Sequence, residues 1–270
     1  MTWTRRRQRR VRLLWSAPVF AMIAGMTLLL SGCGLAFLGA SSPETGAITL
    51  TPDNRTANPA VPAQVGTAGY SATEGAVVVV IGDSISTGYQ TSVEDSWPNL
   101  LMQDFDRAGF PVTVVNAAEN GAGYLVPGGE GMTFEEQARS SVPPDADVVL
   151  VYGSENDIGE DVAQISSKVE AISAAVRELA PEAKVVFVGP ASYDPDVDPD
   201  LTAIRDQIAQ GAESAGAAFV DPIQEQWIMG DREDLIGPDG DHPSVAGHVY
   251  LSQKFETIVA PLLGVAVPTP

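Results

Sequence analysis

The chain has 270 residues, 44% of them hydrophobic and 7% aromatic, a composition that supports a globular core and excludes a disordered or fibrous protein. It carries 35 acidic and 15 basic residues, and the formal net charge of −20 at pH 7 excludes a role based on binding the phosphates of nucleic acid. Its single cysteine has no partner for an internal disulfide or for a cysteine-based metal cluster.

The first 33 residues have the pattern of an export signal. Six arginines lie within residues 5–12, an apolar run follows over Leu13–Leu30, and the segment ends in Leu-Ser-Gly-Cys at Cys33. This ending resembles the bacterial lipobox, which implies cleavage before Cys33 and attachment of diacylglycerol to its thiol. Each buried acyl methylene contributes about 0.8 kcal/mol of membrane affinity, so a lipidated Cys33 would hold the protein at a membrane. The alternatives are an uncleaved transmembrane anchor and an ordinary signal peptide with an incidental cysteine.

Cleavage at this site changes the charge of the mature protein. The signal contains six of the basic residues and none of the acidic ones, which leaves nine basic and 35 acidic residues and a net charge near −26. Such a surface repels nucleic acid and opposes docking to anionic lipid through basic residues. We therefore expect no nucleic-acid partner, and neutral or cationic ligands are favoured over anionic ones.

Gly34–Gly75 is rich in Pro, Ala, Thr, Gly and Ser and has little apolar periodicity. This composition predicts a flexible tether, with a root-mean-square span of roughly 35 Å for a coil of about 40 residues. The sequence thus predicts a signal over residues 1–33, a tether over residues 34–75 and a globular domain over residues 76–270.

In the globular domain, short valine-rich runs alternate with segments of helical spacing, as expected when strands are buried on both faces of a sheet. The predicted strands are Ala76–Ile81, Val112–Asn116, Val148–Val151, Lys184–Val188 and Ala218–Val220. The predicted helices are Ser96–Ala108, Thr133–Ser140, Val162–Ala180 with Asp161 as its N-cap, Leu201–Ala215 and Ser244–Leu262. The alternation predicts a three-layer α/β/α fold, doubly wound and flavodoxin-like, with a mostly parallel five-stranded sheet.

Polar clusters follow the first three predicted strands, and a fourth precedes the last helix. Reactive residues of doubly wound sheets lie beyond the carboxyl ends of the strands, so we expect all four clusters at one edge. The clusters are Gly82–Gly88, Asn116–Gly123, Gly153–Asp157 and Asp239–Pro243.

A serine becomes a nucleophile when a base takes its proton and a third group orients the base. The sequence has two histidines, so the base is His242 or His248. His242 lies in a polar loop that ends in proline, whereas His248 falls within a predicted helix, where packing or surface exposure accounts for it. Asp239 is better placed than the adjacent Asp241 to accept the other ring proton of His242.

Acyl transfer also needs hydrogen-bond donors aimed at the oxyanion of the transition state. The candidates are the backbone N–H of Ser84 at a strand-to-helix turn, the backbone of Gly121 and the side-chain amide of Asn156. The loss of one such donor costs about 3 kcal/mol of barrier stabilisation.

The four clusters resemble, in order, the four sequence blocks of the GDSL/SGNH hydrolases, and the resemblance covers roughly residues 77–262. Gly82-Asp83-Ser84 with Gly88 is similar to the nucleophile block, Asn116 followed by Gly121 to the glycine block, Gly153-Ser154-Glu155-Asn156-Asp157 to the Gly-x-x-Asn-Asp block, and Asp239-Gly240-Asp241-His242-Pro243 to the Asp-x-x-His-Pro block.

This resemblance implies a catalytic triad of Ser84, His242 and Asp239. It also implies an oxyanion hole formed by Ser84, Gly121 and Asn156. The expected activity is hydrolysis of carboxylic esters through an acyl-enzyme, without a cofactor or metal.

The glycine block departs from the family pattern, because Glu119-Asn120 precede Gly121 and Gly123 is a rival donor. The blocks also have structural interpretations: Ser84 as a helix N-cap, and Asn156-Asp157 and Asp239-Gly240 as turns. We expect Asp83 to bond neighbouring backbone amides rather than to take part in the chemistry.

Two loops lie beside these blocks. Asp194–Asp200 carries carboxylates at alternate positions but lacks the glycine and glutamate spacing of an EF-hand, so we expect a solvated loop. Gly121–Gly131 is rich in glycine but lacks the Gly-Lys-Ser/Thr of a phosphate-binding loop, and we expect a mobile rim that shapes the acyl pocket.

The sequence therefore predicts an exported serine hydrolase, anchored through Cys33 to the outer face of the bacterial cell membrane. We expect a monomer that acts on a small-molecule or envelope ester. One alternative keeps the same site in an O-acyltransferase that modifies envelope carbohydrate. Another is a lipoprotein that binds an envelope ligand without catalysis, for which Asp239 and His242 have no use.

Overall fold

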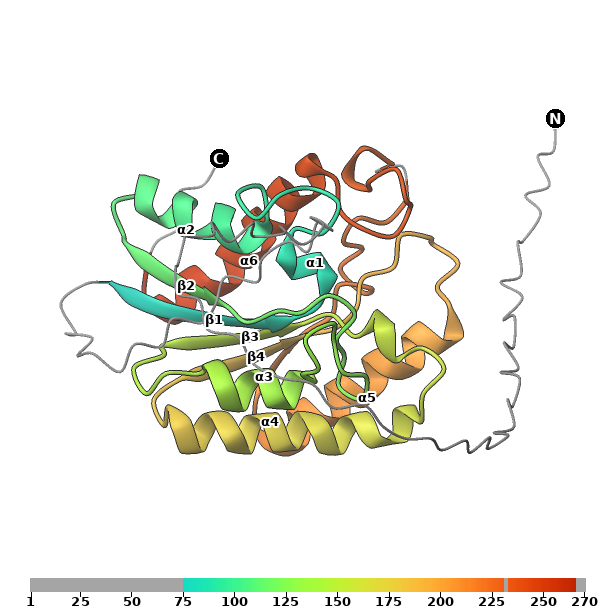
Figure 1. Ribbon diagram of the computed structural model, residues 1–270, viewed down its shortest axis with the longest axis horizontal. Helices are drawn as coiled ribbons and strands as arrows, with labels where there is room; N and C mark the ends of the chain where they lie inside the picture. The colour runs from blue at the N-terminus through green and yellow to red at the C-terminus, as the bar shows by residue number, and fades with distance from the viewer. Residues whose placement is uncertain (1–74, 231–232, 266–270) are drawn as a thin grey trace, which may run out of the picture. The chain divides into compact units, whose positions relative to one another are not determined.

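The computed structural model describes residues 75–230 and 233–265 (Figure 1). The predicted export signal, the lipidation site at Cys33 and the predicted tether up to residue 74 lie outside the described residues. The first described element, β1, begins at Ala76.

Five strands form one sheet in the order β2-β1-β3-β4-β5, and all four pairings are parallel. This is the strand order of flavodoxin-like, doubly wound folds, so the predicted fold class is confirmed. The strands are β1 (Ala76–Gly82), β2 (Val112–Asn116), β3 (Val148–Tyr152), β4 (Lys184–Val188) and β5 (Ala218–Val220).

Strand β1, which lies between β2 and β3, is buried on both faces. Val77, Val79 and Ile81 face one hydrophobic core, and Val78 and Val80 face the other. A strand that has no solvent-facing side carries a continuous apolar run instead of an alternating one. The run of four valines and an isoleucine therefore fits a strand that is covered by helices on both faces.

Helices cover both faces of the sheet, with α2 and α6 on one side and α3, α4 and α5 on the other (Figure 1). No helix of the described ranges is long and apolar enough to cross a membrane. The α-helices are α1 (Ser84–Thr87), α2 (Trp97–Arg107), α3 (Phe134–Ser141), α4 (Ile165–Leu179), α5 (Pro199–Ala215) and α6 (Val245–Leu263), and the 3-10 turns are η1 (Glu155–Asp157), η2 (Val162–Gln164) and η3 (Glu233–Leu235).

The predicted strands agree with the structure to within one residue at each end, helix α5 begins two residues before its predicted start, and one predicted helix is divided. The segment 162–180 is a 3-10 turn, η2, followed by α4. Asp161 occupies the N-cap position of η2, but its side chain makes no capping bond, and its carboxylate instead accepts a hydrogen bond from the side chain of Gln164 at 3.1 Å. The short helix α1 has no counterpart among the predicted helices.

His248 packs in the core between α6 and the start of α2. It is fully buried, and its Nδ1 accepts a hydrogen bond from the backbone N–H of Trp97 at 3.3 Å. Burial lowers the pKa of the His248 imidazole from 6.5 to about 4, against a smaller opposing effect of the Asp95 carboxylate. The folded protein therefore holds a neutral ring that the unfolded protein protonates more readily.

We predict that this imidazole makes the protein sensitive to mild acid. Because the pKa of His248 is lower in the folded protein than in the unfolded protein, the unfolded protein takes up a proton first as the pH falls. The free energy of unfolding is therefore highest above pH 6.5, and it decreases by about 3 kcal/mol in all as the pH falls toward 4. In His248→Gln, a neutral acceptor replaces the ring. Urea unfolding of both proteins at pH 7 and pH 4.5 should show wild type losing about 2–3 kcal/mol more than the variant on acidification. An equal loss in both would contradict this role.

Candidate active site

The polar clusters meet where the strand order reverses. β2 and β3 flank β1 on opposite sides, and the first cluster begins at the carboxyl end of β1. The backbone of Gly82 is satisfied there by the buried side chain of Gln137, which bonds both its N–H (3.0 Å) and its C=O (3.1 Å). The same C=O accepts the N–H of Glu119 at 3.1 Å, so the second cluster is attached to the end of β1.

Ser84 is the first residue of α1. The buried Asp83 is the N-cap of this helix, and its carboxylate accepts the N–H of Ile85 at 2.9 Å. The helix ends after one turn because Gly88 adopts a left-handed conformation with φ 81°. The Ser84 side chain is half-buried at this turn, in reach of a partner from another segment.

Three side chains form a continuous series of hydrogen bonds. Ser84 Oγ lies 2.9 Å from His242 Nε2, and His242 Nδ1 lies 2.7 Å from Asp239 Oδ2. A carboxylate beside Nδ1 holds the ring proton on that nitrogen, which leaves the lone pair of Nε2 facing the serine hydroxyl. The structure thus brings the predicted nucleophile, base and orienting acid together, in the geometry of a serine nucleophile with its base.

The Asp239 carboxylate is held by its own loop. Its Oδ1 accepts the backbone N–H groups of Asp241 and His242, both at 3.1 Å. Partial burial raises the pKa of Asp239, but these hydrogen bonds and that from the His242 ring outweigh it, so the pKa lies below its usual value. Asp239 therefore stays ionised beside the imidazole at neutral pH. The Asp241 backbone C=O accepts the hydroxyl of Tyr193 at 3.0 Å, which ties the loop to the segment after β4.

The glycine block forms a tight turn. Gly121 has φ 80°, and the N–H of Ala122 donates to Glu119 C=O at 3.1 Å, which is the pattern of a type II turn. Within the described residues, neither the Gly121 nor the Ser84 backbone N–H has a hydrogen-bond acceptor. The rival donor is excluded, because the Gly123 N–H already donates to Val126 C=O at 2.8 Å.

Gly123 is instead required for close packing. A Cβ on this residue would lie 2.4 Å from Asp157 Oδ1. The Asp157 carboxylate accepts three consecutive backbone N–H groups, those of Tyr124, Leu125 and Val126, at 2.8–3.2 Å. Burial raises the pKa of Asp157, and these hydrogen bonds partly offset the increase.

The segment 121–131 is therefore fastened to the protein, and our expectation of a mobile rim was wrong. Besides the three bonds to Asp157, Glu119 Oε2 accepts the N–H groups of Glu130 and Met132 at 3.1 and 3.2 Å. The Tyr124 ring is buried in the core beneath α3. The sequence signal for this arrangement is weak, because a buried Asp and a surface Asp look alike before folding.

Asn156 reaches the same loop from η1. Its side-chain amide donates to Ala122 C=O at 2.9 Å, and the residue is otherwise exposed. One of its two N–H groups is thus used to hold the turn at Gly121, and the other remains for a ligand. The preceding Ser154 has φ 97°, an uncommon conformation for a residue other than glycine, as is often found at functional sites.

Tyr89 is a site residue that sequence reasoning missed. Its ring lies against the His242 ring, with centroids 4.8 Å apart and an interplanar angle of 58°, although 40% of the residue is exposed. The turn that carries it has positive φ on both sides, at Gly88 and at Gln90. An exposed aromatic just after the nucleophile block was the available signal, but nothing in the sequence placed it on His242.

The acidic loop at residues 194–200 has a structural role. In the loop 194–200, Asp194 bonds the N–H of Asp196, and Asp198 bonds the N–H of Asp200 as the N-cap of α5. No group of three or more His, Cys, Asp or Glu side chains within the described ranges is placed to hold a metal ion.

Comparison with known proteins finds a family and relatives that include ester hydrolases. The model of the GDSL-like Lipase/Acylhydrolase family matches residues 80–250. A GDSL lipase of Mycobacterium tuberculosis is 39% identical over 191 residues, which cover 69% of this chain and 80% of that protein. An arylesterase of Vibrio mimicus is 36% identical over 80 residues, 30% of this chain and 37% of that protein.

Solved structures share the fold. TesA superposes with a TM-score of 0.58 at 22% identity, over 69% of this chain and 99% of that one. A carbohydrate acetylesterase from Sinorhizobium meliloti superposes with a TM-score of 0.55 at 16% identity, over 69% and 99% of the two chains. The family match and the lipase and arylesterase relatives agree with the geometry at Ser84: the chain belongs to the GDSL-like lipase/acylhydrolase family and is a carboxylic ester hydrolase.

Proposed function

We propose that this protein hydrolyses carboxylic esters with Ser84 as nucleophile, His242 as general base and acid, and Asp239 as the group that orients the imidazole. The observation that carries the proposal is the series of hydrogen bonds from Asp239 through His242 to Ser84, at 2.7 and 2.9 Å. A binding protein has no need of this series. No cofactor or metal enters the proposed reaction.

The proposed reaction has two acyl-transfer steps. Ser84 Oγ attacks the ester carbonyl while His242 Nε2 takes its proton, and the tetrahedral intermediate expels the alcohol oxygen, which receives that proton. Water then attacks the acyl-enzyme with His242 again as base, which releases the carboxylic acid and restores Ser84. The Asp239 carboxylate stabilises the imidazolium that forms in each step.

The oxyanion hole is proposed to consist of the Ser84 and Gly121 backbone N–H groups and the Asn156 side-chain amide. Support comes from the two N–H groups that have no acceptor within the described residues and from the Asn156 amide, which contacts the turn that carries Gly121. Donors fixed in advance stabilise the oxyanion without reorganisation at the moment of reaction.

We predict that the three residues of the proposed triad are required for ester hydrolysis. Ser84→Ala and His242→Ala should each lower kcat/KM for p-nitrophenyl esters by about 10⁴-fold or more, and Asp239→Asn by up to about 10⁴-fold. Hydrolysis by purified wild type and variants, with acyl groups of increasing length, provides the measurement.

Two matched controls accompany this prediction. His248→Gln removes the other histidine, and Asp241→Asn removes a carboxyl group next to His242 without touching the bond to Nδ1. Both should keep most of the wild-type activity. Hydrolysis by Ser84→Ala at the wild-type rate would refute the proposed nucleophile, and an excess of acylated sugar over free acid with a sugar acceptor would indicate an acyltransferase.

We also infer that Tyr89 restrains the His242 ring. The support is the 4.8 Å ring contact at a residue that is 40% exposed. An aromatic face near a cation contributes about 0.5–1 kcal/mol at an exposed site, and the contact also limits rotation of the imidazole.

Tyr89→Leu should therefore lower kcat about two- to fivefold, while Tyr89→Phe, which keeps the ring, should retain the wild-type value. Equal kcat for the Leu and Phe variants would show that the ring does not act on His242.

For location, we propose an exported lipoprotein held at the outer face of the bacterial cell membrane through diacylglycerol on Cys33. In this arrangement residues 1–33 are the signal, residues 34–75 the tether and residues 76–270 the hydrolase domain, and the protein is a monomer. The support is the Leu-Ser-Gly-Cys sequence after a basic and apolar segment, in a protein whose single cysteine is Cys33.

Cys33→Ala should move the protein from the membrane fraction to the soluble fraction, because the acyl groups supply the membrane affinity. Cys33→Ser serves as a near-isosteric control with the same expected result. Mass spectrometry of the wild-type amino terminus should find a diacylglyceryl cysteine, and membrane retention of both variants would point to an uncleaved helix instead.

A further inference from the structure

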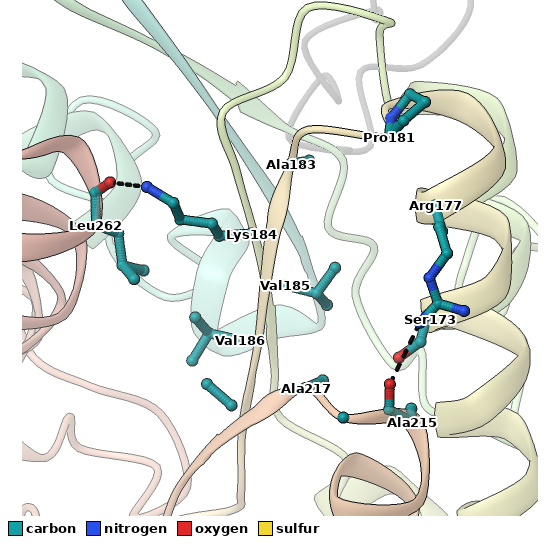
Figure 2. A pocket seen from close by; sticks show the side chains of 12 residues that line it. Ser173, Arg177, Pro181, Ala183, Lys184, Val185, Val186, Ala215, Ala217 and Leu262 are labelled. Atoms are coloured by element: carbon teal, nitrogen blue, oxygen red, sulfur yellow. Dashed lines mark hydrogen bonds between the residues drawn. The ribbon is translucent and has the colours of Figure 1, made fainter.

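A pocket of about 350 Å³ lies at the amino-terminal ends of β4 and β5 (Figure 2). It forms because β5 begins opposite Val186, so the first two residues of β4, Lys184 and Val185, have no β5 neighbour. Ser84 follows the carboxyl end of β1 in the same parallel sheet. The pocket therefore lies at the amino-terminal end of the strands, whereas the proposed active site lies at their carboxyl end, and the two are separate.

The pocket wall is mostly apolar. It is formed by the end of α4, the start of β4, the turn between α5 and β5, and the end of α6. The apolar lining residues include Pro181, Ala183, Val185, Val186, Ala217 and Leu262.

Ser173 is a buried hydroxyl without a partner in this wall. The residue lies on α4 and is 3% exposed, and its Oγ has no hydrogen-bond partner within residues 75–230 and 233–265. Figure 2 shows it beside Arg177, on the side of α4 that borders the pocket. A buried polar group left unsatisfied costs about 1–3 kcal/mol, so a ligand that bonds Ser173 would recover this energy.

The pocket is lined by two cationic side chains, which is unusual in a protein with so many acidic residues. Of the seven Lys and Arg residues in the described ranges, four pair with carboxylates and Lys254 lies over aromatic rings. The other two, Arg177 and Lys184, bond only backbone C=O groups, of Ala215 (3.3 Å) and Leu262. Both residues line this pocket, Arg177 from α4 and Lys184 from β4, and the Lys184 ammonium points toward Leu262 (Figure 2).

Helix capping accounts for only part of this arrangement. Ala215 and Leu262 lie at the carboxyl ends of α5 and α6, where cations are favourable. Each cation uses one donor in this way, and a guanidinium has five N–H groups in all. Capping also gives no reason for the unsatisfied Ser173 hydroxyl, which points to a ligand.

We propose that the pocket binds a small organic carboxylate with a short aliphatic tail. The carboxylate would bond Arg177 and Ser173, the tail would lie on Val185 and Ala217, and Lys184 would add positive charge. Arginine presents paired donors that match a carboxylate, and the volume falls in the range of about 300–1,000 Å³ found for small-molecule sites. Inorganic phosphate fits the cations but leaves the apolar wall uncovered. The proposal does not rest on catalysis at Ser84, although ester hydrolysis also releases a carboxylic acid.

The test is equilibrium dialysis of radiolabelled hexanoate against the full-length protein, with Ser84 blocked covalently by an alkyl phosphonate so that the active site is closed. Wild type should bind one hexanoate per protein molecule, and unlabelled hexanol and inorganic phosphate should compete poorly. Arg177→Gln should weaken binding about tenfold, because a charge-assisted hydrogen bond is lost, and Ser173→Ala should weaken it several-fold. Arg139→Gln makes the same charge change on α3, away from the pocket, and should bind as wild type does.

A second measurement guards against a folding defect in the variants. Hexanoate should raise the Tm of the phosphonate-blocked wild type and of Arg139→Gln, and it should raise the Tm of Arg177→Gln much less at the same concentration. Competition by hexanol at equal strength would show a merely apolar hollow, and equal competition by phosphate would show a site for anions in general. Either result, or unchanged binding in Arg177→Gln, overturns the proposal and leaves the esterase assay unaffected.

Discussion

The buried carboxylate of Asp83 joins the two segments on which the active site is built. Its oxygens accept the N–H of Ile85 in α1, at 2.9 Å, and the N–H of Ser154 after β3, at 3.1 Å. Burial raises the pKa of Asp83 to about 6, and the two backbone hydrogen bonds oppose this increase. A buried carboxylate without these partners would be costly, so the segment that carries Ser84 and the one that leads to Asn156 are fixed together.

Glycines make this close approach possible. A Cβ at Gly153 would lie 2.2 Å from Asp83 Oδ2, and a Cβ at Gly123 would lie 2.4 Å from Asp157 Oδ1. In both cases a buried carboxylate accepts backbone N–H groups from a neighbouring loop, and a glycine leaves the space for it. The strands bring the loops to one edge, but these two carboxylates set how the loops sit against each other.

The fold was predictable because its signals are local and strong. Valine runs buried on both faces identify the strands, and the three-residue spacing of Asp239 and His242 allows their contact within one turn. Other features depend on distant neighbours. The choice of Gly121 over Gly123 follows from the bond of Gly123 to Val126, which no sequence pattern encodes.

The contact between Tyr89 and His242 joins residues that are far apart in the sequence. The pocket at Ser173 exists because β5 starts two residues later than its neighbour β4. Registers and start points of this kind are set by packing of the whole sheet. Sequence periodicity locates elements but does not fix their relative stagger.

The proposed base and its orienting acid belong to one short loop, whereas the proposed nucleophile belongs to another segment. The site therefore depends on one contact within the loop and on one contact between the loop and the rest of the domain. The Asp239–His242 contact is local, because Asp239 also accepts the backbone N–H of His242. The contact of His242 with Ser84 spans 158 positions of the sequence and depends on how this loop docks on the end of β1. The Tyr193 hydroxyl holds the loop at the Asp241 C=O, and the Tyr89 ring lies on the imidazole from the α1 side. A loop displaced from these two contacts would keep the Asp–His pair intact and lose only the bond to the serine. The docking of this loop therefore determines whether the serine has a base.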